Sequence, residues 1–332
     1  MAIGNTPQDR PALSEEQRQH FLEHGWVRIP KAISPENIEK FSSDVWVRLG
    51  YDKDDMSTWK QEQIHLPRHR EIQWKEFTPK AWSAICEILG GEDKIDPNLF
   101  SKCGDSLTVN LGTEGWREKT IHPRDLDNWH VDGDWFERYL DSGEQALVPL
   151  MLFNEVKPRA GATCICEDGL NHMIKWLHDR PQGSTTMTDP DGKRAIDVIN
   201  ECNKFVELTG EAGDVFLCHP LMPHSASKNH LRVPRFLTNS PVVLKEPLNF
   251  NRSNPQEYSL VELKTLRELG VESLPEWHIT GVRSKFTPIT RTGKDARIKE
   301  ELERMKAHAA KTGGIVDSMH INGIVKYSPD IL

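Results

Sequence analysis

A histidine and an aspartate two residues apart, His130 and Asp132, are the side chains in this sequence best suited to metal chemistry. In a β-strand alternate side chains point to the same face, so an imidazole and a carboxylate at this spacing can face one point. They would supply two ligands of the 2-His-1-carboxylate triad, which holds non-haem Fe(II) and leaves coordination positions open for oxygen chemistry. The pair alone is weak evidence because the chain has 14 histidines, so a third ligand must come from elsewhere.

His224 is the favoured third ligand. It follows Gly213-Asp214 and an apolar run, a pattern typical of a turn that opens a buried strand, and a Ser-rich turn comes directly after it. His219 competes for this role, but five residues earlier it would point to the opposite face of a continuous strand, and its alternative is a hydrogen-bonded core histidine.

Arg235 lies eleven residues after His224, at the start of a predicted strand that runs to Val243. Its planar guanidinium is suited to bind the carboxylate of an organic acid at the metal through two charge-assisted hydrogen bonds. A surface salt bridge is the alternative, but the apolar neighbours of Arg235 predict a buried and therefore paired guanidinium.

Together these residues resemble the phytanoyl-CoA dioxygenase family of Fe(II)/2-oxoglutarate oxygenases. The resemblance is carried by His130-x-Asp132, by His224-Ser225-x-x-x-Asn229 with Arg235, and by residues 13–27, and it covers about residues 13–245. It implies a double-stranded β-helix (jelly-roll, cupin-like) core with the metal in the barrel mouth. One departure concerns the family's Pro-Gly-Ser-His segment, because the matching stretch here is 165–170; the substrate pocket therefore does not transfer by analogy.

The resemblance also implies the cofactors and the activity. Fe(II) would be held by His130, Asp132 and His224, 2-oxoglutarate would bind the metal and reach Arg235 with its far carboxylate, and O2 would follow. A C–H bond of a small molecule would be oxidised by hydroxylation, desaturation or oxidative cyclisation, with release of succinate and CO2, in secondary or amino-acid metabolism. Halogenation is not expected, because related halogenases lack the carboxylate that Asp132 supplies.

Two other functions stay open. A cupin-type hydrolase or isomerase could use the same ligands, but it would leave Arg235 unexplained. A non-catalytic small-molecule binder on the same scaffold would need none of these polar groups at one point.

Further candidates surround these residues. Thr238 and Asn110 are weaker candidates for holding the co-substrate. The candidates for substrate contact are Trp129, Asp134, Trp135 and Phe136, although such aromatic residues are more often core than contact and an acid like Asp134 more often caps a helix or forms a turn.

Composition narrows the class of protein. The 332 residues carry a net charge of −8 without a long basic run, so we expect no nucleic-acid partner. No apolar stretch approaches the ~20 residues of a membrane span, and residues 1–10 lack the apolar core of a signal peptide. Six cysteines show no disulfide framework, so a reducing, cytoplasmic location is the expectation. Cys164-x-Cys166 lacks the second pair of a zinc site and is interpreted as core packing.

The predicted fold is mainly β with flanking helices (α+β), because many short strands alternate with Gly/Pro turns and the helices gather at the ends. We expect a flexible tail over 1–12, the oxygenase domain with its N-terminal helices over 13–250, and a helical extension over 251–332. The extension would pack on the core or serve a homodimer contact.

Caps and periodicity place the individual elements. Helices are expected from Ser14 to His24, from Ser34 to Gly50, from Thr78 to Gly90, over 168–177, over 255–269 and over 292–311. Strands are expected over 26–30, 107–111, 147–155, 162–166 and 205–209, and the His130 segment is expected to be a strand as well. Residues 51–77 are predicted to be a loop with His69-Arg70-Glu71 on the surface, and residues 179–194 a loop long enough to be a lid.

Overall fold

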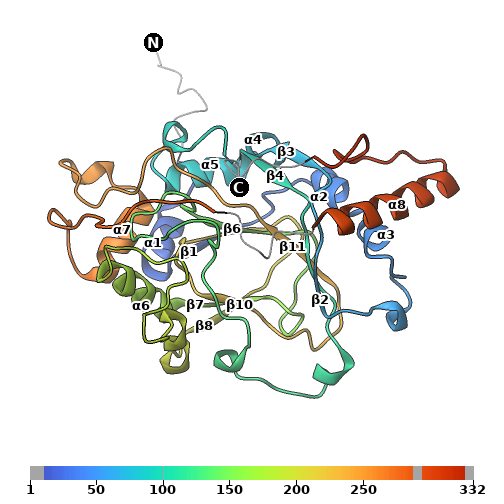
Figure 1. The fold of residues 1–332 in the computed structure, drawn as a ribbon, viewed down its shortest axis with the longest axis horizontal. Helices are drawn as coiled ribbons and strands as arrows, with labels where there is room; N and C mark the ends of the chain where they lie inside the picture. The colour runs from blue at the N-terminus through green and yellow to red at the C-terminus, as the bar shows by residue number, and fades with distance from the viewer. Residues whose placement is uncertain (1–10, 100, 287–293, 326–332) are drawn as a thin grey trace, which may run out of the picture.

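Two antiparallel sheets form the centre of the chain in a computed structural model that describes residues 11–99, 101–286 and 294–325 (Figure 1). The larger sheet has the order β1 (Trp26–Ile29), β9 (Val215–Cys218), β6 (Val148–Leu152), β11 (Arg235–Asn239), β5 (Thr108–Asn110) and β2 (Gln63–His65). The smaller sheet has the order β10 (His224–Ala226), β7 (Thr163–Cys166) and β8 (Phe205–Leu208), and lies below the larger one in Figure 1. A separate ribbon pairs β3 (Glu71–Gln73) with β4 (Lys102–Gly104). The predicted α+β arrangement is confirmed.

Helices flank the sheets. They are α1 (Glu15–His24), α2 (Pro35–Ser42), α3 (Val45–Leu49), α4 (Trp74–Phe77), α5 (Pro79–Ile88), α6 (Glu167–His178), α7 (Leu260–Leu269) and α8 (Lys294–Thr312). Short 3-10 turns are η2 (Met56–Thr58), η3 (Glu92–Lys94), η4 (Glu114–Trp116), η5 (Pro123–Asp125), η6 (Ala195–Glu201) and η7 (Pro255–Glu257). The Ser14–Gln17 capping box begins α1 as predicted, and Gly25, with φ 77°, ends it. No described helix is both long enough and apolar enough to cross a membrane.

Three parts of the predicted secondary structure are wrong. The helix expected from Ser34 to Gly50 is two helices, because the chain turns at Ser43 and Asp44 between α2 and α3. Residues 51–77 are not a loop, since they contain β2, β3 and α4. Three-residue strands are too short to show an alternating pattern, so periodicity misses them. His130 does not lie in a strand as predicted; it forms an isolated β-bridge with His224.

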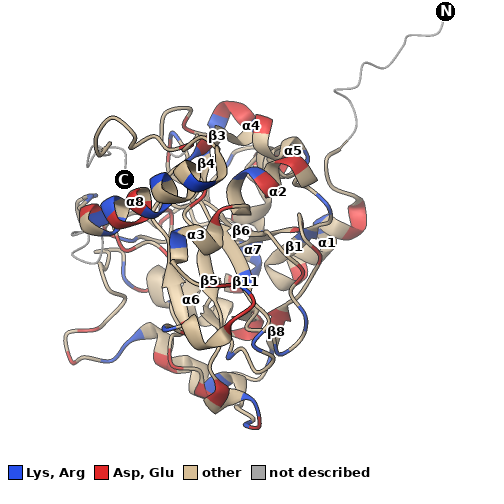
Figure 2. Cartoon of the chain, turned by 90° about the vertical axis from the view of Figure 1, so that its right-hand side faces the viewer, with Lys and Arg blue, Asp and Glu red and all other residues tan. Residues whose placement is uncertain are grey.

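The two C-terminal helices pack on helices from earlier in the chain. α7 contacts α1 and α6, and α8 contacts α3. Only Ile298, Glu301, Leu302 and Met305 of α8 are buried, and basic and acidic residues are interspersed along the helix (Figure 2). Of the tail expected over 1–12, only residues 11 and 12 are among the described residues. Residues 292 and 293 of the predicted helix also lie outside the described residues.

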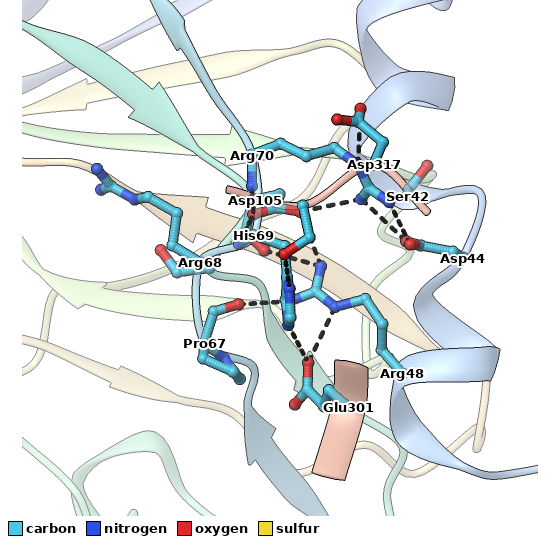
Figure 3. A network of polar contacts seen from close by, with 12 residues as sticks. Ser42, Asp44, Arg48, Pro67, Arg68, His69, Arg70, Asp105, Glu301 and Asp317 are labelled. Atoms are coloured by element: carbon cyan, nitrogen blue, oxygen red, sulfur yellow. Dashed lines mark hydrogen bonds and ion pairs between the residues drawn. The ribbon is translucent and has the colours of Figure 1, made fainter. Parts of the chain in front are cut away.

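A buried polar network attaches α8 to the rest of the molecule (Figure 3). Arg48 of α3 is fully buried and places its Nε 3.0 Å from Glu301 and its Nη1 3.0 Å from Asp105. His69 is also fully buried, with Nε2 3.3 Å from Glu301, and Arg70 binds both Asp105 and Asp44. The prediction that His69-Arg70-Glu71 lies on the surface is therefore wrong. The charges are buried because acidic partners arrive from segments distant in sequence.

We expect the Arg48→Met variant to lose about 3–5 kcal/mol of unfolding free energy, because the buried Asp105 and Glu301 carboxylates lose the fully buried cation that they share. Urea unfolding followed by circular dichroism measures the loss. Glu303→Gln is the control, since it removes an exposed ion pair with Lys306 on the same helix and should leave stability close to wild type. Equal effects of the two substitutions would contradict the structural role of the network.

Candidate functional site

His130 and His224 are brought together by an isolated antiparallel bridge. Each residue donates its main-chain N–H to the carbonyl of the other, at 3.0 and 2.9 Å. Directly opposed residues of an antiparallel pair present their side chains on the same face, and the two imidazole centroids lie 4.3 Å apart. Asp132 Oδ1 lies 3.4 Å from His130 Nε2 and 3.6 Å from His224 Nε2. The three residues predicted to bind a metal therefore converge.

The orientation of both imidazoles is fixed by main-chain carbonyls. His130 Nδ1 lies 2.8 Å from the Asn128 carbonyl oxygen, and His224 Nδ1 lies 3.0 Å from that of Met222. A carbonyl oxygen only accepts, so each Nδ1 carries a hydrogen and each Nε2 is the nitrogen left to face Asp132. Metal-binding histidines are usually held in this way through the ring nitrogen that does not bind the ion.

Two residues that the sequence did not indicate hold the Asp132 segment. Asn239, at the end of β11, donates from Nδ2 to Asp132 Oδ2 at 2.9 Å, which leaves Oδ1 facing the histidines. Arg138 donates from Nη2 to the main-chain carbonyls of Asp132 and Gly133. Gly133 has φ 108°, and a Cβ there would lie 2.6 Å from Arg138 Nη2, so this turn requires glycine. The sequence holds no local signal for either contact.

The charges at the site suit a cation. Burial alone would raise the pKa of the Asp132 carboxyl, but the charges and hydrogen bonds of His224 and His130 hold it well below its ordinary value. Asp132 is therefore ionised. Two donors that each lie about 2.1 Å from one ion are roughly 3.0 to 3.4 Å apart, so the observed separations fit one ion with small shifts. Two imidazoles and a carboxylate are the donor set of non-haem Fe(II).

Arg235 is the second distinctive feature of the site. Its side chain is 2% exposed, and within the described chain its Nε and Nη2 have no hydrogen-bond partner. Arg235 and Asn239 are four residues apart on β11, so their side chains project from the same face of the strand. Asn239 contacts Asp132 on that face. Burial lowers the pKa of Arg235 to about 10, which still leaves it charged at neutral pH. The predicted burial is confirmed, and the described chain supplies no partner to Nε or Nη2.

The two weaker co-substrate candidates are placed differently. Asn110 of β5 lies directly across from Arg235, but its amide already donates to the Ser227 carbonyl and accepts from Gly112 N–H. Thr238 is three residues from Arg235 and so projects from the other face of β11, where its hydroxyl donates to the Ser106 carbonyl. The structure does not bring Thr238 to the guanidinium.

The candidates for substrate contact lie around the triad rather than in it. The Trp129 indole donates to the Pro123 carbonyl and its ring packs on Phe205. Trp135 and Phe136 are buried and pack edge to face, which is a core arrangement. Asp134 is exposed.

His219, the competing ligand, is buried elsewhere. Its Nε2 lies 3.0 Å from the Thr265 hydroxyl, and its Nδ1 accepts from Leu221 N–H. Burial lowers its pKa to about 3, so it is a neutral core histidine. The preference for His224 over His219 agrees with this arrangement.

Comparisons with known proteins give weak similarities. No family model and no curated protein matches the sequence. Among solved structures, the non-heme alpha ketoglutarate dependent carbocyclase SnoK from nogalamycin biosynthesis is 16% identical, with 71% of this chain and 86% of that chain covered and a TM-score of 0.38. The epimerase SnoN in complex with Fe3+, alpha ketoglutarate and nogalamycin RO is 15% identical, with 84% and 96% covered and a TM-score of 0.40. HygX from Streptomyces hygroscopicus, with nickel and 2-oxoglutarate bound, is 12% identical, with 70% and 88% covered and a TM-score of 0.35. At such values the similarities do not establish what this chain does.

We expect Asn239→Ala to weaken Mn2+ binding about 10- to 100-fold, because Asp132 loses the hydrogen bond that orients it. The electron paramagnetic resonance signal of free Mn2+ measures the affinity, and His130→Ala provides the reference for loss of a ligand. Asn251→Ala is the matched control, since Asn251 is exposed. An Asn239→Ala affinity equal to that of the control would show that this hydrogen bond does not orient Asp132.

Proposed function

We propose that this chain is an Fe(II)- and 2-oxoglutarate-dependent oxygenase that oxidises a C–H bond of a small molecule and releases succinate and CO2. Hydroxylation, desaturation and oxidative cyclisation all belong to this reaction class. The observation that carries the proposal is a pair of complementary features. Asn239 of β11 contacts the ionised 2-His-1-carboxylate set, and the same face of β11 carries a buried arginine, Arg235, whose Nε and Nη2 have no partner in the described chain.

The unpartnered guanidinium supports an acidic co-substrate. A buried cation without a partner is destabilising by several kcal/mol, so its retention calls for an anion that binds there. A carboxylate matches the guanidinium fork with two parallel hydrogen bonds. 2-Oxoglutarate has a carboxylate at each end, so one end suits the metal and the other suits Arg235.

Each residue then has a defined task. His130, Asp132 and His224 would hold Fe(II), which supplies the capacity to activate O2 when bound. Asn239 and Arg138 keep the Asp132 segment in place, and the Asn128 and Met222 carbonyls keep both Nε2 atoms directed at the ion. Arg235 would fix the far end of the co-substrate. Anchoring at Arg235 would use binding energy to position the co-substrate, which favours a reactive geometry.

The same proposal extends to the fold. The six-stranded and three-stranded sheets would be the two walls of a double-stranded β-helix, with β11 contributing Arg235 and Asn239 from one wall and β10 contributing His224 from the other. A jelly-roll of this kind encloses a ligand site between its sheets. We further propose that residues 251–332 are an extension of this domain.

We expect the Fe(II)-loaded protein in air to release succinate from 2-oxoglutarate, and His130→Ala to abolish the release because a ligand is lost. For Arg235→Met we expect the KM for 2-oxoglutarate to rise about 10- to 100-fold, since hydrogen bonds between charged groups are removed. Chromatographic detection of succinate measures both the release and the KM for 2-oxoglutarate.

Arg267→Met is the matched control, because Arg267 lies exposed on α7 and should leave KM unchanged. Calorimetry of 2-oxoglutarate binding to the metal-loaded protein covers the case of slow turnover without a substrate. No binding to the wild type, or equal binding to Arg235→Met, would exclude the proposal and favour a metal-dependent hydrolase or a small-molecule binder.

A further inference from the structure

A second group of side chains of the types that bind metals lies at the end of β7. Cys166, Asp168 and Cys202 place their sulfur and carboxylate donors within 4.8 Å of one another. Cys166 Sγ lies 3.2 Å from Asp168 Oδ1. Both cysteines are buried and neither forms a disulfide. Asp168 is half-buried, so the group can be reached from its carboxylate side.

We propose that Cys166, Asp168 and Cys202 form a zinc site that is separate from the triad. Two thiolates and a carboxylate are ligands that Zn2+ prefers, and soft sulfur donors distinguish this group from the nitrogen and oxygen donors of the triad. The three groups carry like charges when deprotonated, so a divalent cation would convert their repulsion into coordination. Three protein ligands leave a fourth tetrahedral position for water.

The donors are held by the surrounding chain. Cys166 ends β7, and Asp168 lies in the first turn of α6, where it accepts from the main-chain N–H groups of Asn203 at 2.8 Å and Lys204 at 3.1 Å. Those two residues directly follow Cys202. The carboxylate therefore already links the two segments that supply the sulfurs, and Zn2+ would complete this link.

Two neighbours limit the space around Cys166. Gly169 lies so close that a Cβ there would be 3.1 Å from Cys166 Sγ. Ile199 belongs to the same buried cluster as the two cysteines, with Trp129 packed against it. Cys164, on the same strand, is not part of the group.

Binding needs no oxidant. Each thiol loses its proton as a sulfur–zinc bond forms, so two protons leave to solvent and no atom changes its oxidation state. The spacing of the cysteines in the sequence does not predict this zinc site. Cys202 is 36 residues after Cys166 and is not in a Cys-x-x-Cys pair.

Co2+ substitution tests the proposal, because a thiolate-to-cobalt charge-transfer band in the near ultraviolet requires sulfur ligands, which the triad lacks. We expect this band in the wild type with two Co2+ per chain, enough for both proposed sites, and in His130→Ala with one, and we expect added Zn2+ to remove it. Cys166→Ser and Cys202→Ser should lose the band, whereas Cys164→Ser, the matched control on β7, should keep it.

The arms with wild type, His130→Ala and Cys164→Ser do not depend on how well the other variants fold. No band in the wild type would overturn the proposal, as would a band that persists in Cys202→Ser or disappears in Cys164→Ser. The proposal is independent of oxygenase activity, since loss of succinate release in His130→Ala leaves the cobalt–sulfur band unaffected.

Discussion

Two main-chain hydrogen bonds between His130 and His224 are the constraint on which the site depends. They join segments 94 residues apart, 224 − 130 = 94, and they set both imidazoles on one face without a continuous strand on the His130 side. β10 gains its own support from β7, where Ile165 lies opposite His224. The turn at Gly133 and the hydrogen bond from the Arg138 guanidinium then hold Asp132 close to the two imidazoles. The convergence of three ligands therefore follows from backbone pairing rather than from the local spacing of His-x-Asp.

Two of the buried arginines, Arg48 and Arg235, have surroundings that differ in an informative way. Arg48 has Asp105 and Glu301 as partners, so its charge is compensated within the chain and its role is structural. Arg235 is as deeply buried, but its Nε and Nη2 have no partner among the described residues. The cost of desolvation is similar for both guanidinium groups, and only the first is offset by the protein itself. The difference supports the proposal that Arg235 binds an anionic ligand, on physical grounds that do not depend on similarity to other proteins.

The sequence predicted the donors of the site better than it predicted their supports. Residue chemistry singled out His130, Asp132, His224 and Arg235, and helix caps placed α1, since these signals are local. The contacts of Asn239 and Arg138 depend on where short strands and turns meet, and a three-residue strand carries no readable period. His69 shows the same limit, because its burial depends on Glu301, 232 residues away, 301 − 69 = 232. Burial of a polar residue is decided by distant partners, which no sequence window contains.

Strand β7 serves two groups of polar donors at once. Its Ile165 lies opposite His224, and the next residue, Cys166, directs its sulfur into the apolar cluster with Cys202. Successive side chains of a strand point to opposite faces, so the two groups share a backbone without sharing space. Their donors also differ in kind, since imidazole and carboxylate suit iron whereas thiolates suit zinc. The two proposed sites therefore call for different metals. Zinc at the sulfur-rich group would connect Cys166, at the end of β7, to Cys202 and so would fix the strand that pairs with His224 of β10.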